Sequence, residues 1–389
     1  METILLRNIR ICCEEGKLQK GSLLFKDGSI ERMLDVKETP THCKVIDGEN
    51  GLALPGFIDI HIHGANGADV MDNEPMAIEN IALSLPSEGT TSFLATTMTQ
   101  SLEDIAKAVK RIRHYYTGQN SEGAELLGIH LEGPFIHPDK AGAQPSKFIV
   151  RPTISLLNRL FDDDLACLKI VTMAPEQDVD FNMITHLKKQ DVIISAGHTT
   201  ADHQKIVDAI DNGISHLTHI CNAMDGIHHR KMGPVGTAIL DKRLFVEVIA
   251  DGVHLSKEML KILYECVGLE RILLITDAMR AKGLSDGSYM LGGQAVTVSS
   301  GMATLADGTL AGSLLKFNEG LKIFREATGA TIFELKNMSS STAAKRLGVW
   351  DRKGSIEVGK DADVVVLNDS LDVMLTFCKG RLVYQNEKM

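Results

Sequence analysis

The feature that most constrains the fold is a regular alternation of segments between residues 56 and 276. Eight short apolar stretches, typical of buried strands, are separated by longer segments, several of which have helical spacing of their apolar residues. The predicted strands are Phe57–His61, Thr91–Thr96, Glu125–Leu131, Leu168–Met173, Val192–Ala196, Ile214–Thr218, Phe245–Ile249 and Ile272–Thr276. Apolar strands that alternate with helices form parallel sheets covered on both faces. Eight such units favour an α/β fold of the (β/α)8 TIM barrel type over an open sheet.

The two ends of the chain have a different pattern. Residues 1–54 and the tail after residue 354 contain short β-like runs separated by turns. The most economical arrangement is one small domain to which both termini contribute strands. We therefore predict a small β-sandwich domain from residues 1–54 and 355–389, and a barrel domain from residues 55–354.

Charge and cysteine content exclude several classes of protein. The formal net charge of −10 gives no general reason to expect nucleic acid or an anionic membrane as a partner. Seven scattered cysteines without a C-x-x-C pair fit a reducing compartment better than a disulfide framework. Arg7 and Arg10 interrupt the apolar N-terminal stretch, and no window has the length and apolarity of a membrane span. We expect a cytoplasmic protein.

Two histidines follow the first barrel strand in the run Asp59-Ile60-His61-Ile62-His63. Alternate side chains of a strand share a face, so His61 and His63 are expected to point in the same direction. Two imidazoles side by side at the end of a buried strand are typical of a pair of metal ligands.

Other predicted strands also end in residues that bind metals or move protons. These residues are Glu132, His198, His219 and Asp277, after strands three, five, six and eight. Functional groups of a barrel gather at the carboxyl ends of its strands, so we expect all six side chains to meet. Imidazoles with a carboxylate suit Zn²⁺ or a similar first-row ion and do not suit Mg²⁺ or Ca²⁺.

This set predicts a hydrolytic reaction. Glu132 and the two histidines after strands five and six would hold one ion with an open position, where the pKa of water falls toward ~7. The pair His61 and His63 would hold a second ion, with Glu132 shared. Asp277 would take a proton from water and return it to a leaving amine, which favours cleavage of a C–N bond. Taken singly, each residue also fits a structural role, and we interpret His130, His203 and His216 as such.

A basic cluster, His228-His229-Arg230-Lys231, follows strand six by about ten residues. In an acidic chain it indicates either a solvated loop or a contact for phosphate, which arginine recognises with two parallel N–H groups. Asn222-Ala223 and His254 follow strands six and seven, and are further candidates for the rim of the site.

Several motifs resemble a known family. They are PGFIDIHIHG (55–64), GTTSFLAT (89–96), HLEGPFI (130–136), SAGHT (195–199), THICNAM (218–224), ADGVH (250–254), ITDAM (275–279), GTLAGS (308–313) and GSIEVGKDADVVVL (354–367). The chain resembles the amidohydrolase superfamily, and within it the deacetylases of amino-sugar phosphates. The resemblance implies hydrolysis of N-acetyl-D-glucosamine 6-phosphate to D-glucosamine 6-phosphate and acetate. It also implies that Glu132, His198 and His219 are the main metal ligands and that Asp277 is the acid/base.

The resemblance carries further expectations about ligands and assembly. It implies a sugar-phosphate site formed by Ala143, Gln144, Asn222, Ala223, Arg230, Asp251, His254, Leu310, Ala311 and Gly312. It implies a homodimer in which Arg230 reaches the phosphate in the neighbouring subunit. Because this chain keeps His61 and His63, it is expected to hold one or two divalent ions, Zn²⁺ or alternatively Fe²⁺, Co²⁺ or Mn²⁺. Three alternatives remain: deacetylation of N-acetylgalactosamine 6-phosphate, hydrolysis of another C–N bond on the same scaffold, and a barrel protein that has lost its activity.

Overall fold

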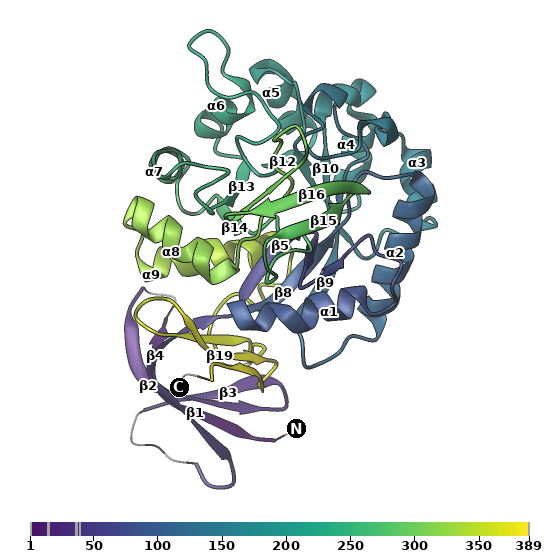
Figure 1. Ribbon diagram of the computed structural model, residues 1–389. Coiled ribbons are helices and arrows are strands. Elements are labelled where there is room, and N and C mark those ends of the chain that lie inside the picture. The colour runs from purple at the N-terminus through teal and green to yellow at the C-terminus, as the bar shows by residue number, and fades with distance from the viewer. Residues whose placement is uncertain (1, 14–15, 36–37, 39, 388–389) are drawn as a thin grey trace.

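The computed structural model describes residues 2–13, 16–35, 38 and 40–387 (Figure 1). Its centre is a parallel sheet of eight strands in the order β14-β13-β12-β11-β10-β9-β8-β5. The strands are β5 (Phe57–Ile62), β8 (Thr90–Thr96), β9 (Glu125–Glu132), β10 (Leu168–Met173), β11 (Ile193–Ala196), β12 (Ile214–Leu217), β13 (Phe245–Ile249) and β14 (Ile272–Ile275). All eight predicted strands are present in chain order, which confirms the predicted barrel class.

The first and last strands of this sheet meet along a seam. The backbone N–H of Asp277 donates to the carbonyl of His61 at 2.8 Å, and that of His63 donates to the carbonyl of Ala278 at 2.9 Å. At the same place the Thr276 hydroxyl donates to Oδ2 of Asp59 at 2.5 Å. These bonds bring β5 and β14 together, so the ends of both strands face one site.

Helices cover the outer face of the barrel. They are α1 (Ala77–Ser84), α2 (Leu102–Thr117), α3 (Ile154–Phe161), α4 (Asn182–Lys188), α5 (His203–Asn212), α6 (Gly233–Leu240), α7 (Lys257–Val267) and α8 (Phe317–Thr328). Helix α2 shows why such segments form: Ser101 caps its first turn by accepting from the backbone N–H of Asp104, and an apolar stripe that includes Ile105 and Ile112 is buried against the sheet.

A helical segment at residues 332–346 lies at the amino-terminal end of the barrel. It consists of α9 (Ile332–Lys336), a π-helical turn at 337–341, and α10 (Thr342–Arg346). The hydroxyl of Ser340 donates to the carbonyls of Pro55 and Gly56, just before β5. Ala343 and Ala344 pack with apolar residues of the barrel strands. This segment therefore covers the end of the barrel that lies opposite the predicted site.

The two termini together form a mixed sheet of seven strands. These are β1 (Ile4–Cys12), β2 (Leu18–Lys26), β3 (Ser29–Leu34), β4 (Lys44–Pro55), β18 (Val364–Leu367), β19 (Val373–Cys378) and β20 (Arg381–Gln385). Their order is β20-β19-β18-β4-β1-β2-β3, with β1 parallel to β4 and the remaining pairs antiparallel. In Figure 1 the purple and yellow strands lie side by side below the barrel. The prediction that both ends contribute strands to one β structure is confirmed, while the division into two domains stays a prediction whose limits at residues 1 and 389 lie outside the described residues.

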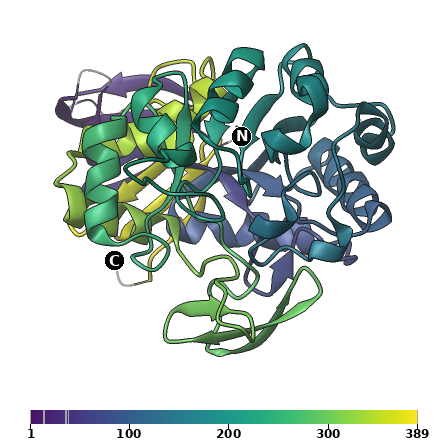
Figure 2. The ribbon, with the colours of Figure 1, turned by 90° about the horizontal axis from the view of Figure 1, so that it is seen from above.

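Short elements join these parts. A two-stranded ribbon of β6 (Gly64–Ala65) and β7 (Ala68–Asp69) follows β5, and five 3₁₀ turns occur at 85–88, 138–140, 146–148, 175–177 and 179–181. A three-stranded sheet of β15 (Gly287–Leu291), β16 (Gln294–Ser299) and β17 (Met302–Thr304) projects from the barrel, as Figure 2 shows.

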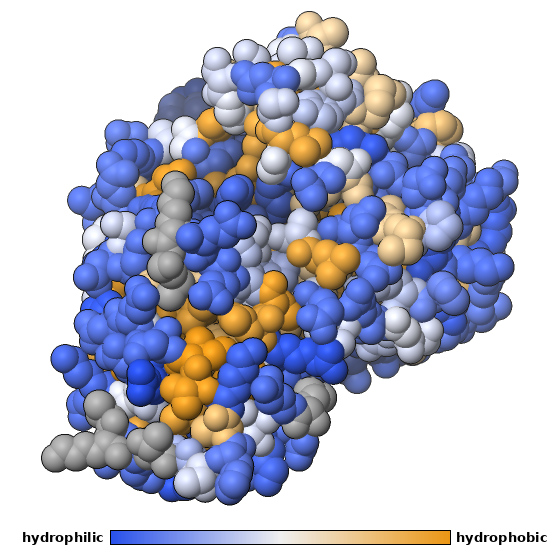
Figure 3. Space-filling view, turned by 60° about the horizontal axis from the view of Figure 1, so that its bottom comes forward, coloured by the Kyte–Doolittle hydropathy of each residue, from blue (hydrophilic) through white to orange (hydrophobic). Residues whose placement is uncertain are grey.

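Figure 3 shows a face on which hydrophilic side chains predominate, with a patch of hydrophobic ones in its lower half. Within the ranges that the structure describes, no helix has both the length and the apolarity that crossing a bilayer requires.

Candidate metal centre

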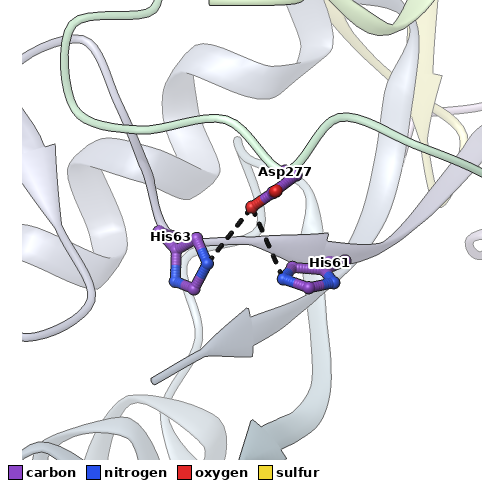
Figure 4. A group of neighbouring side chains, drawn as sticks. All are labelled: His61, His63 and Asp277. Carbon is purple, nitrogen blue, oxygen red and sulfur yellow. Dashed lines mark ion pairs between the residues drawn. The ribbon is translucent and has the colours of Figure 1, made fainter. Parts of the chain in front are cut away.

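His61, His63 and Asp277 come together across the seam (Figure 4). Oδ1 of Asp277 lies 3.2 Å from Nε2 of His63 and 3.5 Å from Nε2 of His61. All three side chains are buried, and one ligand atom from each lies within 4.8 Å of the others. The strand alternation predicted for His61 and His63 thus turns both rings toward one carboxylate.

Glu132, His198 and His219 form a second group from the ends of β9, β11 and β12. Oε1 of Glu132 lies 3.2 Å from Nε2 of His198 and 3.1 Å from Nε2 of His219. The other oxygen, Oε2, lies 3.2 Å from Nε2 of His63. Glu132 therefore connects the two groups, and all six residues selected from the strand ends lie in one cluster.

Three of these residues have an unusual backbone conformation. His198, His219 and Asp277 have φ angles of 49°, 29° and 48°. Positive φ is uncommon for residues other than glycine and occurs often at functional sites, where packing holds the strained conformation. The left-handed conformation turns the chain sharply where the strand ends, which places each side chain over the end of the barrel.

The electrostatics of the cluster favour positive charge at its centre. Burial raises the pKa of Asp277, but His61 and His63 outweigh this effect and lower it to about 2. Burial lowers the pKa of His61, but the carboxylates of Asp277 and Glu132 outweigh that effect and raise it to about 9. The pKa of Glu132 is likewise held well below its usual range, against burial, by His61 and the histidines that bond to it.

The residues fit a divalent cation. Nε2 of His61 is buried and has no hydrogen-bond partner among the described residues, although Glu132 and Asp277 lie within 3.6 Å. An unpaired buried ring nitrogen that faces two carboxylates is what a metal ligand requires before the ion is added. Imidazole and carboxylate donors together suit Zn²⁺ and its first-row neighbours.

Glu247 is a functional residue that sequence reasoning missed. It lies in β13 and is fully buried. Its Oε2 accepts a hydrogen bond from Nδ1 of His61 at 2.9 Å and another from the backbone N–H of His219 at 3.3 Å. The available signal was a carboxylate inside the apolar run Phe-Val-Glu-Val-Ile, since a buried charge is costly unless it is paired.

A cavity of about 340 Å³ opens above the cluster. Predicted substrate contacts that line it are Ala143, Gln144, Asn222, Ala223, His254, Leu310 and Gly312. Met98, Lys140, Leu291 and Thr309 also line it and were not predicted. Lys140 forms an ion pair with Asp225 at 2.6 Å, a contact between two loops that no local pattern indicates.

Gln144 contacts the cluster directly. Its Nε2 donates to Oε2 of Glu132 at 2.6 Å, and its Oε1 accepts from the backbone N–H of Thr99 at 2.7 Å. The side-chain amide therefore fixes one oxygen of Glu132 in addition to lining the cavity.

Three predicted substrate contacts lie outside this cavity. Asp251 accepts a hydrogen bond from Nδ1 of His254 at 2.7 Å and so holds that ring in place. Ala311 is buried in a small apolar cluster near β16. Arg230 is exposed on the loop before α6, where its guanidinium contacts His229. Their roles toward a substrate stay predictions.

Other histidines have the structural roles that we inferred. Nδ1 of His130 bonds to the carbonyl of Ile60 at 3.0 Å, and its Nε2 bonds to the Thr172 hydroxyl at 2.7 Å. Nδ1 of His203 bonds to the Thr237 hydroxyl at 2.9 Å. With both nitrogens occupied by neutral partners, His130 is a core residue rather than a ligand.

The fold and this centre together define a class of protein. A metal-binding cluster at the carboxyl ends of a barrel, with a mixed sheet from both termini, describes an amidohydrolase, and the sequence model of the "Amidohydrolase family" matches residues 52–383. The chain belongs to the amidohydrolase family.

Similar proteins narrow the relationship within that family. The N-acetylglucosamine-6-phosphate deacetylase of Bacillus subtilis (strain 168) is 44% identical over 386 residues, with 98% of each chain covered. The N-acetylgalactosamine-6-phosphate deacetylase of Escherichia coli O157:H7 is 38% identical, covering 98% of this chain and 99% of its own.

Solved structures agree in shape over nearly the full length. The N-acetylglucosamine-6-phosphate deacetylase of Thermotoga maritima has a TM-score of 0.88 at 35% identity, and the alignment covers 98% of this chain and 100% of that one. A mutant of the Mycobacterium smegmatis enzyme of the same name, in complex with N-acetyl-D-glucosamine-6-phosphate, has a TM-score of 0.91 at 28% identity, with 99% and 100% covered.

Proposed function

We propose that this chain hydrolyses N-acetyl-D-glucosamine 6-phosphate to D-glucosamine 6-phosphate and acetate. The observation that carries the proposal is the buried cluster of Glu132, His198, His219, His61, His63 and Asp277 beneath a cavity. The 44% identity to a deacetylase with this substrate in its name supports the choice of sugar phosphate.

In this proposal Glu132, His198 and His219 hold one divalent ion, and His61 and His63 provide for a second. A divalent ion in such a site acts as a Lewis acid on a carbonyl and makes water nucleophilic near neutral pH. Glu247 accepts a hydrogen bond from Nδ1 of His61, the ring nitrogen that does not face the centre, and so orients Nε2 toward the ion. Gln144 donates to Oε2 of Glu132 and so fixes the carboxylate in the orientation that ligation needs.

Asp277 serves as the acid/base in the proposed reaction. A pKa near 2 keeps its carboxylate ionised at neutral pH, ready to accept a proton from the attacking water. Once it carries that proton, it is the group placed to deliver it to the amine as the C–N bond breaks. The amine is a poor leaving group until it is protonated, so one carboxylate performs both transfers.

The polar residues of the cavity serve the sugar. His254, whose pKa is raised by Asp251 in spite of burial, remains a hydrogen-bond donor that Asp251 orients. Asn222 and Ala223 follow shortly after His219 and line the same cavity, so in this proposal their backbone and amide groups contact the acetamido group. These contacts provide orientation, while the cluster provides the chemistry.

The phosphate group is assigned to Arg230 of a neighbouring subunit. This arginine is exposed and does not line the cavity of its own chain, yet it belongs to the densest basic cluster of an acidic protein. A homodimer in which each loop reaches across to the other site accounts for both observations. Arginine is suited to this task because its N–H groups match the geometry of a phosphate.

The test is acetate release from purified protein of measured metal content. We expect turnover of N-acetyl-D-glucosamine 6-phosphate and little turnover of the unphosphorylated sugar. Equal turnover of both sugars would refute the phosphate contact.

N-acetyl-D-galactosamine 6-phosphate is the second candidate substrate, because a relative named for it is 38% identical. Preferential turnover of that isomer would replace the first assignment. Comparing activity after loading with Zn²⁺, Fe²⁺, Co²⁺ or Mn²⁺ identifies the ion.

A further inference from the structure

A second and larger cavity, of about 800 Å³, lies at the opposite end of the barrel. Its walls are the residues that begin β10, β11 and β12, together with the carboxyl end of α10. The metal centre lies at the other ends of the same strands. The volume falls within the range of small-molecule sites, and nothing in the proposed reaction uses this cavity.

Four cationic side chains line the cavity: Lys169, Lys188, Lys345 and Arg346. Within residues 2–13, 16–35, 38 and 40–387, none of the four has a carboxylate within ion-pair distance. Nζ of Lys169 donates to the carbonyl of Ala166 at 3.3 Å, and Nζ of Lys345 lies 4.5 Å from the ring centroid of Trp350, so neither contact offsets the positive charge with a carboxylate. Three aspartates also line the cavity: Asp164 pairs with Arg113, whereas Asp163 and Asp191 are exposed, so the four cations outnumber the two aspartates for which the structure shows no ion pair among the described residues.

Arg346 is the most constrained of these cations. Its Nη2 donates to the Ser215 hydroxyl at 3.1 Å, and its guanidinium carbon lies 4.4 Å from the ring centroid of Phe245. Its Nε is buried without a hydrogen-bond partner in the described part of the chain. The stack on Phe245 fixes the plane of the guanidinium and leaves most of its N–H groups unused. An unpaired, half-buried charge is costly, and an anion would offset that cost.

A buried histidine beside this arginine adds a further unused group. His216 is stacked with Phe245 at 5.3 Å, and its Nδ1 bonds to the same Ser215 hydroxyl at 3.0 Å. Its Nε2 is buried and has no hydrogen-bond partner among the residues described. Ser215 and Arg346 line the cavity, whereas His216 is fully buried and is not part of the lining, so the unused N–H groups that a ligand could reach are those of Arg346.

We propose that this cavity binds a small molecule through a phosphate group. The planar fork of Arg346 matches two phosphate oxygens, and the three lysines supply point charges for a group that carries about two negative charges at neutral pH. A carboxylate presents two oxygens to the guanidinium in the same geometry as a phosphate does, but it carries half the negative charge. The lysines therefore favour a phosphate group. The site is separate from the metal centre and lies at the far end of the barrel.

The test uses the metal-loaded, full-length protein and calorimetric titration with pyrophosphate. Lys188 and Lys189 are adjacent and both exposed, but only Lys188 lines the cavity, so Lys189→Gln is a matched control for Lys188→Gln. We expect Lys188→Gln to weaken binding about two- to fivefold, as the loss of an exposed charge contact does. Arg346→Lys keeps the charge but loses the fork and should weaken binding about tenfold or more. Lys189→Gln should bind as the wild type does.

Three outcomes would overturn the proposal. Equal pyrophosphate affinity in the wild type, Lys188→Gln and Arg346→Lys places any binding elsewhere. Competition between pyrophosphate and N-acetyl-D-glucosamine 6-phosphate places it in the catalytic cavity. Tighter binding of citrate than of pyrophosphate makes the ligand a carboxylate. The rate of acetate release by Lys188→Gln should equal that of the wild type in every case. Because Lys188 is exposed, this variant is expected to fold, and it tests the site even if Arg346→Lys folds poorly.

Discussion

Glu247 accepts a hydrogen bond from His61 on the ring nitrogen that faces away from the metal centre, with 2.9 Å between Oε2 and Nδ1. This bond holds a proton on Nδ1, so Nε2 is the ring nitrogen that would give up its proton to a metal ion. The same carboxylate oxygen accepts from the backbone N–H of His219. One buried residue therefore positions a ligand of each metal group.

Replacing Glu247 with glutamine should weaken metal binding more than it disturbs the fold. The amide has the same shape but accepts a weaker hydrogen bond, and loss of such supporting carboxylates reduces metal affinity about 10- to 100-fold. Metal content after dialysis against a competing chelator measures the effect. Glu270→Gln, which alters an exposed carboxylate, is the control and should retain metal as the wild type does. Equal retention by Glu247→Gln would show that the contact is only structural.

Asp277→Asn should remove activity while the ions stay bound. An amide cannot accept the proton of water, and the loss of a positioned acid/base costs about 10²- to 10⁴-fold in rate. Acetate release and metal content are measured on the same preparation. Activity within tenfold of the wild type would refute the proton-transfer role, whereas loss of metal together with activity would make Asp277 chiefly a ligand.

The assignment of Arg230 to a neighbouring subunit predicts complementation. Arg230→Gln homodimers lack the phosphate contact in both sites, and Asp277→Asn homodimers lack the acid/base in both. In a mixed dimer, one site has the intact Asp277 of its own chain and the intact Arg230 of the other chain. Co-expression followed by purification through two different tags should therefore restore activity to roughly half the wild-type value, since one of two sites is complete. If the mixed dimer is as inactive as its parents, Arg230 does not act across the interface.

An ion network between the barrel and the terminal sheet predicts acid sensitivity. Oε2 of Glu125, at the start of β9, lies 2.7 Å from Nζ of buried Lys353, which also pairs with Asp363 near β18. Burial raises the pKa of Glu125, but Lys353 and Arg352 outweigh it and lower the pKa to about 2. The carboxylate of the unfolded chain titrates near ~4.3, so its contribution is complete above that pH and is lost as the pH falls toward 2.

Urea unfolding of Glu125→Gln tests this linkage. At pH 7 the variant should be less stable than the wild type by roughly 1–3 kcal/mol, because the cations around Glu125 lose a charged partner. The difference should shrink steadily as the pH falls from about 4.5 toward 2, where the wild-type carboxylate is also neutral. A difference that does not change between pH 7 and pH 3 would show that packing, not charge, accounts for the loss.

Removal of metal should lower the thermal stability of the protein. It should also widen the pH range over which the ionisable groups of the cluster titrate. An ion that binds only the folded state stabilises it by about 2.7 kcal/mol when its free concentration is 100 times its Kd. Chelator-treated protein should therefore have a lower thermal midpoint, which Zn²⁺ restores and Mg²⁺ does not, because Mg²⁺ prefers oxygen ligands. Recovery with Mg²⁺ would contradict the assigned ligand set.

Residues whose signals are local were predictable from the sequence. The barrel strands were found because buried parallel strands are nearly continuous apolar runs, and β10 and β13 match their predicted limits. The residues of the candidate metal centre were selected because each ends or follows such a run. Strand β3 was not predicted, since its sequence Ser-Ile-Glu-Arg-Met-Leu lacks a continuous apolar stretch and depends on pairing with β2.

Residues whose roles depend on distant contacts were not predictable in this way. Glu247 and His61 are 186 positions apart, and only the closed barrel makes them neighbours. Arg346 and Ser215 are 131 positions apart. The sequence around an arginine near the end of a helix does not reveal whether its charge will have a carboxylate partner in the fold. The left-handed backbone of His198, His219 and Asp277 is likewise not predictable from the sequence: histidine and aspartate adopt positive φ more often than most residues, but they do so at few positions, and tertiary packing selects which.

The seam between β5 and β14 has a consequence for how the protein matures. During synthesis His61 and His63 leave the ribosome more than 200 positions before Asp277. The backbone bonds that join their strands exist only when the last barrel strand has docked beside the first. A nascent or prematurely terminated chain can offer single imidazoles to a metal ion, but it cannot assemble the full set of ligands with its proton-transfer group. The full set of ligands and the proton-transfer group therefore come together only when the barrel is complete.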